Sequence, residues 1–171
     1  MTPARKSKIE RVMGNRQKDL HVIIEHVDDP HNIGAILRSC DAFGVGEVHL
    51  LYTKKKPPRM QELKTKAAAS AVKWLKITKW TSVTALVRYV KKQKIRIVTT
   101  GLTKKAIDLP ALNCAQPIAF VLGNEHDGVS PQMLKAAHDN VNIPMVGFVQ
   151  SFNVSVAAAL LLYESFRQRH L

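Results

Sequence analysis

Short apolar runs alternate along the chain with longer segments whose apolar residues recur at helical spacing. The short runs predict strands, because a strand buried on both faces reads as a continuous apolar stretch, and the periodic segments predict helices. We expect strands at residues 21–27, 47–52, 74–78, 95–100, 118–122 and 141–144, and helices at 3–16, 33–43, 82–93, 131–138 and 154–166. This alternation predicts an α/β fold with a mostly parallel sheet covered by helices on both faces.

The last predicted helix has no polar face. Every residue from Val154 to Leu162 is apolar except Ser155. A helix that is apolar all round is buried on more than one side, so we expect the domain core on one side and a second subunit on the other. Ser151 and Asn153, just before this helix, are candidate caps for its free backbone N–H groups.

The charge is distributed unevenly along the 171 residues, a length that fits a single domain with its own core. The formal net charge is +13, and basic residues concentrate in residues 1–18, 54–66 and 88–96. Residues 117–166, by contrast, contain Lys135 as their only lysine or arginine. Because a basic surface attracts polyanions, this distribution indicates a nucleic-acid partner that contacts the first two thirds of the chain.

Other classes of protein are disfavoured by the sequence. No apolar stretch approaches the length of a bilayer-spanning helix, and the basic N-terminus lacks the apolar core of a signal peptide. Cys40 and Cys114 lie far apart and outside any metal-ligand spacing. We therefore expect a cytoplasmic protein with reduced thiols, no metal and no membrane partner.

Residues 3–16 form a predicted helix with little to bury. Its apolar stripe around Val12 is thin, and its other faces are basic. We interpret residues 1–19 as an arm for RNA and residues 20–171 as the main domain. The candidate phosphate contacts on the arm are Arg5, Lys8, Arg11 and Arg16.

Three sequence blocks are informative together. They are Asn-Ile-Gly-Ala-Ile-Leu-Arg at 32–38, Val-Leu-Gly-Asn-Glu followed by a glycine at 121–128, and Ile-Pro-Met leading to Ser-Phe-Asn-Val-Ser at 143–155. In this order and spacing, the chain resembles the SpoU (TrmH) family of S-adenosylmethionine-dependent RNA ribose 2′-O-methyltransferases, within the SPOUT class. The resemblance covers nearly the whole chain.

The resemblance implies a homodimer whose C-terminal segment forms a deep trefoil knot, which the sequence pattern alone does not predict because knots are rare. It also implies an S-adenosylmethionine pocket beside the dimer interface. The pocket residues that it implies are Thr100, Gly101, Leu122, Gly123, Ile143, Pro144, Met145 and Phe152. Phe152 stands where the family has leucine, so we expect a reshaped pocket wall with binding retained.

The family's reaction needs help at the ribose 2′-hydroxyl, which is a poor nucleophile until its proton leaves. The resemblance points to Arg38 for this role. Because the pKa of arginine exceeds about 12, we expect Arg38 chiefly to stabilise negative charge, with proton acceptance left open. The other candidate catalytic residues are Asn32, Glu125, Ser151 and Asn153. Asn32 is also a candidate helix N-cap.

The chain is most similar to the subgroup that methylates guanosine 18 in the tRNA D loop, so tRNA is the expected partner. Two alternatives stay open. One is methylation of ribosomal RNA, another tRNA nucleotide or other structured RNA, and the other is a non-catalytic RNA-binding dimer. The sequence stops at Leu171, soon after the expected knot helix, and we expect tRNA affinity to rest more heavily on the arm.

Overall fold

A computed structural model describes residues 1–59, 61–63, 71–101, 103 and 105–171. Seven parallel strands form one sheet in the order β3-β2-β1-β6-β4-β7-β5. The strands are β1 (Gln17–Glu25), β2 (Val45–Leu51), β3 (Lys76–Trp80), β4 (Arg96–Thr100), β5 (Ile107–Asp108), β6 (Ile118–Leu122) and β7 (Asp139–Asn142). The helices are α1 (Pro3–Gly14), α2 (Pro30–Ala42), α3 (Val83–Lys92), α4 (Pro131–Ala136) and α5 (Val154–His170), with short 3-10 turns η1 (Ala71–Lys73) and η2 (Leu109–Ala111).

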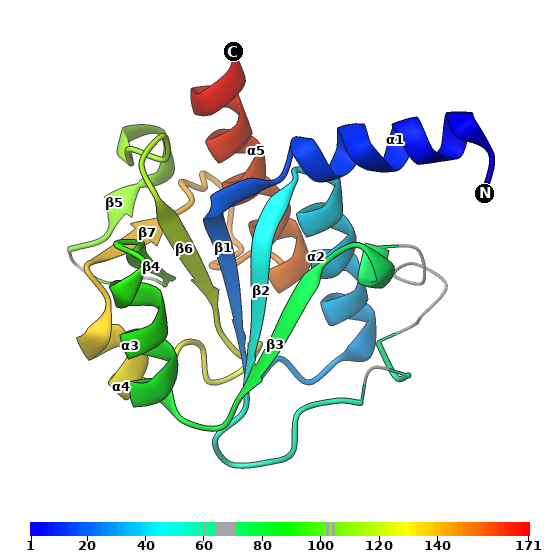
Figure 1. Cartoon of the computed structure of the whole chain (residues 1–171). Helices are drawn as coiled ribbons and strands as arrows, with labels where there is room; N and C mark the ends of the chain where they lie inside the picture. Colours follow the sequence, from blue (N-terminus) through cyan, green and yellow to red (C-terminus); the bar gives the residue numbers. More distant parts are fainter. Residues whose placement is uncertain (60, 64–70, 102, 104) are drawn as a thin grey trace.

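Helices cover both faces of the sheet, which confirms the predicted α/β architecture (Figure 1). Helices α2 and α5 pack against one another on one face, while α3 and α4 lie on the other. The larger apolar core lies under α2 and α5 and includes Leu20, Ile36 and Phe120, and the smaller one lies under α3 and includes Leu86 and Ile97. Burying both faces is what allows the strands to be continuous apolar runs.

Two helix starts test the predicted caps. Helix α2 begins at Pro30 because Asp29 is its N-cap and accepts a hydrogen bond from the His31 backbone N–H. The interpretation of Asn32 as an N-cap is therefore wrong, since Asn32 lies inside the first turn and its side chain is free for other contacts. Asn153 is the N-cap of α5, as predicted, and accepts from the Ser155 backbone N–H at 2.8 Å.

The two-residue strand β5 and the turn η2 are not among the elements expected from the sequence. Elements this short carry no periodicity, so no pattern in the sequence could reveal them. The strand predicted at 74–78 is β3, which runs two residues later, from Lys76 to Trp80. Most of the alanine-rich segment before it, residues 64–70, lies outside the described residues.

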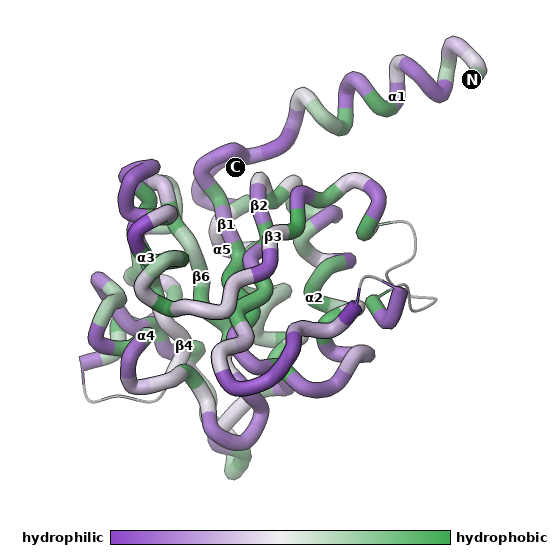
Figure 2. The backbone as a smooth tube through the Cα atoms, turned by 60° about the horizontal axis from the view of Figure 1, so that its bottom comes forward, coloured by the Kyte–Doolittle hydropathy of each residue, from purple (hydrophilic) through white to green (hydrophobic). Residues whose placement is uncertain are grey.

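Helix α1 projects from the body and buries none of its residues (Figures 1 and 2). It leads into the amino end of β1, so it lies at the amino edge of the parallel sheet. Strand β1 has nine residues and spans about 30 Å to the opposite, carboxyl edge. Among the described residues, no helix is long and apolar enough to cross a membrane.

Candidate active site

A cleft of about 610 Å³ opens at the carboxyl ends of β4, β6 and β7, beside the start of α5. Its volume suits a small-molecule ligand, since such sites usually measure about 300–1,000 Å³. The carboxyl edge is also where parallel α/β sheets bind their ligands. Ten of the thirteen residues that the sequence analysis assigned to catalysis or to the cofactor line the cleft: Thr100, Gly101, Leu122, Gly123, Glu125, Ile143, Met145, Ser151, Phe152 and Asn153.

The loop 123–130 forms one wall of the cleft and is held by Asn124. The Asn124 backbone N–H donates to the Gly128 carbonyl at 3.0 Å, and the Gly128 N–H donates to the Asn124 carbonyl at 2.9 Å. The side-chain oxygen of Asn124 accepts hydrogen bonds from the backbone N–H groups of His126 and Asp127, and the side-chain amide of Asn124 donates to the carbonyl of His26 at 2.8 Å. Sequence reasoning did not single out Asn124; the available signal was an asparagine directly after a strand-ending glycine, a position typical of side-chain-stabilised turns.

The far end of the same loop is anchored by Glu25, whose side chain is almost fully buried at the end of β1. The Glu25 carboxylate accepts hydrogen bonds from the backbone N–H of Ser130 at 2.9 Å and from its hydroxyl at 2.6 Å. Ser130 is in turn the N-cap of α4. The loop is therefore tied to the end of β1 at both of its ends.

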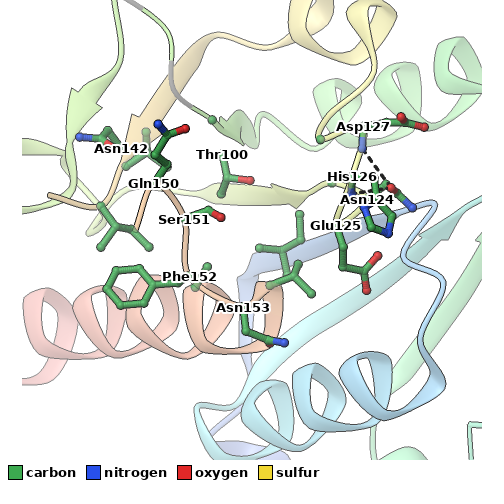
Figure 3. Close-up of a pocket in the computed structure, with 18 of the residues that line it drawn as sticks. Thr100, Asn124, Glu125, His126, Asp127, Asn142, Gln150, Ser151, Phe152 and Asn153 are labelled. Atoms are coloured by element: carbon green, nitrogen blue, oxygen red, sulfur yellow. Dashed lines mark hydrogen bonds between the residues drawn. The ribbon is translucent and has the colours of Figure 1, made fainter. Parts of the chain in front are cut away.

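Three residues from distant parts of the chain meet at the mouth of the cleft: Glu125 and Asn153, which Figure 3 labels, and Asn32 of α2. The Asn32 amide donates to Glu125 Oε1 at 2.8 Å, and the Asn153 amide donates to Asn32 Oδ1 at 3.0 Å. Asn153 also accepts from the Ser155 hydroxyl at 2.6 Å. This chain of hydrogen bonds fixes the orientation of each amide and leaves the Glu125 side chain exposed at the cleft.

The lining of the cleft divides into an apolar part and an acidic part. Leu122, Val141, Ile143, Met145 and Phe152 supply apolar surface. Glu125 and Asp127 supply carboxylates, and no lysine or arginine is among the described lining residues. Such a site fits a ligand that has an apolar aromatic part and carries its own positive charge, and it is a poor site for a phosphate.

Three of the predicted residues lie outside the cleft lining. Pro144 is exposed beside it, and Asn32 reaches it only through the hydrogen bonds to Glu125 and Asn153. Arg38 lies on α2 about 9 Å further along the helix axis than Asn32. Its side chain is exposed and makes no hydrogen bond to any described residue. The structure does not bring Arg38 together with the other candidate catalytic residues of its own chain.

Of the four residues of the arm that were predicted to contact phosphate, three are exposed and one is not. Arg5, Lys8 and Arg11 are exposed on α1. Arg16 instead forms an ion pair with Asp41, and its side chain is 8% exposed. The prediction that Arg16 binds phosphate is therefore corrected, because its guanidinium is committed to fixing the start of β1 against the end of α2.

Outside the cleft, His21, Glu47 and His49 are the group with metal-ligand spacing among the residues that the structure describes. The hydrogen bonds of His21 and His49 are those expected if both imidazole rings are neutral. His21 Nε2 lies 3.0 Å from the Lys18 carbonyl, His49 Nε2 lies 3.1 Å from His21 Nδ1, and the Trp80 indole N–H donates to His49 Nδ1. A metal on His49 Nε2 would require that ring to give up its last proton, so we interpret the group as a structural network.

This network predicts acid sensitivity of the fold. Burial, followed by the neighbouring His21, lowers the pKa of His49 to about 3, despite the opposing effect of Glu47. Below pH 6.5 or so, the unfolded chain binds a proton at His49 that the folded protein does not, so we expect the free energy of unfolding to fall by about 1.4 kcal/mol per pH unit. Urea unfolding between pH 7.5 and 5 measures this slope. His49→Gln should reduce it, and an unchanged slope in that variant would contradict the assignment.

Comparisons with known proteins show what this chain is similar to. The model of the SpoU rRNA Methylase family matches residues 19–163. The tRNA (guanosine(18)-2′-O)-methyltransferase of Escherichia coli K12 is 37% identical over 169 residues, covering 99% of this chain and 72% of that protein. The enzyme of the same name from Thermus thermophilus is 39% identical, covering 98% and 84%.

Solved structures are similar over the same extent. The crystal structure described as the A. aeolicus TrmH/SpoU tRNA modifying enzyme has a TM-score of 0.82 and 33% identity, covering 97% of this chain and 84% of that one. The SpoU methyltransferase AviRb from Streptomyces viridochromogenes, in complex with the cofactor AdoMet, has a TM-score of 0.80 and 26% identity, covering 94% and 64%.

Proposed function

The chain belongs to the SpoU methylase family, and we propose that it transfers the methyl group of S-adenosylmethionine to the ribose 2′-hydroxyl of guanosine 18 in tRNA. The nucleotide is taken from the relatives that match nearly the whole chain. The observation that carries the proposal is the hydrogen-bonded set Asn32, Glu125 and Asn153 at the mouth of a cleft with no lysine or arginine among its described lining residues.

The chemistry of the cleft lining fits S-adenosylmethionine. Apolar side chains such as Leu122, Ile143 and Phe152 would cover the adenine, and the carboxylates of Glu125 and Asp127 favour a positively charged sulfonium. When bound, S-adenosylmethionine supplies an electrophilic methyl group. Phe152 is 40% exposed, so its larger ring extends the apolar wall at the cleft mouth. This position supports the expectation that phenylalanine reshapes the pocket without closing it.

The polar groups at the cleft mouth would position the acceptor ribose. The Asn153 amide donates to the side-chain oxygen of Asn32, and the Asn32 amide donates to the Glu125 carboxylate and orients it. Exposed Glu125 and Ser151 can then hydrogen-bond ribose hydroxyls. Positioning of this kind turns an encounter of two molecules into a reaction within one complex, which lowers the barrier.

A homodimer is part of this proposal. Val146, Phe148 and Val149 are exposed in the loop before α5, and Val156 and Tyr163 are exposed on α5 itself. Large apolar side chains exposed on a surface are typical of protein interfaces. Their location supports the expectation that α5 packs on the core with one side and on a second subunit with the other. The trefoil knot implied by the family resemblance stays a prediction.

We further propose that Arg38 serves the cleft of the partner subunit. It is remote from the cleft of its own chain, yet α2 packs beside α5, which carries part of the proposed dimer face. A guanidinium brought in from a second subunit would supply the cation that the cleft lining lacks. It would stabilise the developing charge on the 2′-oxygen.

The arm is proposed to bind tRNA away from the cleft. Arg5, Lys8 and Arg11 project from a helix that buries none of its residues. Strand β1 begins at Gln17, slightly before the boundary drawn at residue 19. The arm therefore corresponds to α1, and the main domain starts with the first strand.

The proposed function predicts two measurable activities of the purified protein. Calorimetry with S-adenosylmethionine alone should detect binding, because the cleft is formed by one chain. Incubation with radiolabelled S-adenosylmethionine and unmodified tRNA should label the ribose of guanosine 18, as mapped by nuclease digestion. A tRNA with 2′-deoxyguanosine at that position is the control. Absence of cofactor binding would favour a non-catalytic RNA-binding protein, while label at another nucleotide or in ribosomal RNA would correct the substrate.

A further inference from the structure

Loop 53–59 lies at the carboxyl edge of the sheet, directly after β2, while α1 lies at the opposite edge (Figure 1). It carries four basic residues whose side chains are all exposed: Lys54, Lys55, Lys56 and Arg59. The cleft opens at the same carboxyl edge. The loop is therefore on the side of the molecule where the methyl acceptor must enter.

A chain of contacts joins this loop to the cleft. Lys55 forms an ion pair with Asp28. The Asp28 carboxylate accepts a hydrogen bond from the Asn124 side-chain amide at 3.3 Å. The backbone N–H of Asp28 donates to Glu125 Oε2 at 3.4 Å. Asn124 and Glu125 both line the cleft. Lys55 is therefore linked to the cleft wall through a single intervening residue, Asp28.

The loop is also held in place at both ends. The Thr53 backbone N–H donates to His26 Nε2 at 3.2 Å, and Lys79 Nζ donates to the Pro58 carbonyl at 2.8 Å. Cations on a loop anchored in this way lose less conformational freedom on binding a ligand than cations on a free chain.

The charges of the loop are not all neutralised within the protein. Lys55 is paired with Asp28, and Arg59 is paired with Glu62 at 2.8 Å. Lys54 and Lys56 have no ion-pair partner among the described residues. Two exposed lysines therefore remain available for an anion at the rim of the cleft.

A ribose within an RNA chain brings a phosphate on each side, so cations are needed close to any site that methylates it. The cleft lining described here supplies none, and the cationic arm is about 30 Å away at the amino edge. We propose that loop 53–59 is a second RNA-binding surface, on which Lys54 and Lys56 hold backbone phosphates next to the methylated nucleotide. This proposal rests on the proposed function.

Two matched double variants test this surface. Lys54→Gln/Lys56→Gln removes the two loop lysines that have no ion pair among the described residues. Lys73→Gln/Lys135→Gln is the matched control, because it removes two exposed lysines outside the three basic segments, one just before β3 and one just before β7, on the amino side of the sheet. tRNA affinity is measured at several salt concentrations, and methyl transfer is measured in single turnovers. For the loop variant, we expect the slope of log affinity against log salt to fall by about 1.4–1.8, since each lost phosphate contact removes about 0.7–0.9. Its transfer rate at saturating tRNA should also fall, because the ribose is held less well.

The control variant should keep the wild-type transfer rate at saturating tRNA. The inference is overturned if the loop variant retains the wild-type salt slope and rate. It is also overturned if the control variant loses as much rate, because the effect would then reflect net charge rather than this surface. Binding of S-adenosylmethionine should be unchanged in both variants, which verifies folding. Failure of the wild-type protein to methylate tRNA would instead refute the proposed function, so the two failures are distinguishable.

Discussion

Replacement of Gly123 with alanine is expected to abolish cofactor binding and to lower the free energy of unfolding by about 3 kcal/mol. A Cβ atom at this position would lie 2.3 Å from the Gly128 carbonyl carbon and 2.4 Å from the Val129 nitrogen. Both are backbone atoms, so no side-chain rotation relieves the clash. The loop would have to move away from β6, which would break the backbone pairing of Asn124 with Gly128.

Urea unfolding and calorimetry with S-adenosylmethionine measure the two effects of Gly123→Ala. Gly14→Ala is the matched control, because a Cβ at Gly14 meets no atom within 4 Å and alanine favours the helix that this residue ends. We expect that control to bind the cofactor normally and to be at least as stable as the wild-type protein. Normal cofactor affinity in Gly123→Ala would contradict the close approach of the loop to the strand.

Replacement of Arg38 with alanine is expected to lower the single-turnover rate of methyl transfer by about 100-fold, the usual cost of removing one group that stabilises a developing oxyanion. Affinity for S-adenosylmethionine should stay at the wild-type value, since Arg38 is outside the cleft lining. Arg38→Lys should restore only part of the rate, because an ammonium lacks the planar fork of a guanidinium. Near-normal rates in both variants would remove Arg38 from the catalytic residues.

Mixed dimers decide from which subunit Arg38 acts. An equal mixture of Arg38→Ala and Asn153→Ala chains, unfolded and refolded together, should recover about a quarter of the wild-type activity if each site combines the two subunits. Half of the randomly paired dimers are then mixed, and each mixed dimer has one intact site. Activity no higher than that of the separate variants would place Arg38 and Asn153 of the same chain in one site.

Local features of the fold were predictable from the sequence, while the order of the strands was not. The apolar run 118–122 is β6, residue for residue, because a doubly covered strand leaves a direct mark on the sequence. The place of β6 between β1 and β4 depends on contacts such as Leu20 with Ile118, far apart in the chain. Periodicity contains no information about such pairings.

The same distinction applies to the site. The cleft residues Gly123, Ile143 and Phe152 were inferred from the family resemblance, because the motif blocks place them in sequence. The hydrogen bonds of Asn32 to Glu125 and Asn153 join residues separated by about a hundred positions, and no spacing rule predicts them. Arg16 was assigned to RNA by its neighbours in the sequence, whereas its neighbour in space, Asp41, determines its contact.

The position of β6 has a consequence for how the chain folds as it is synthesised. Strands β1 and β2 can pair early, but the other edge of β1 waits for β6, which emerges only in the last third of the chain. Until then the apolar β1 presents an open hydrogen-bonding edge, the kind of surface through which chains aggregate. Pairings this distant in sequence also slow folding. We therefore expect nascent chains stalled before residue 118 to depend on chaperones, and full-length chains to be released from them once β6 pairs with β1.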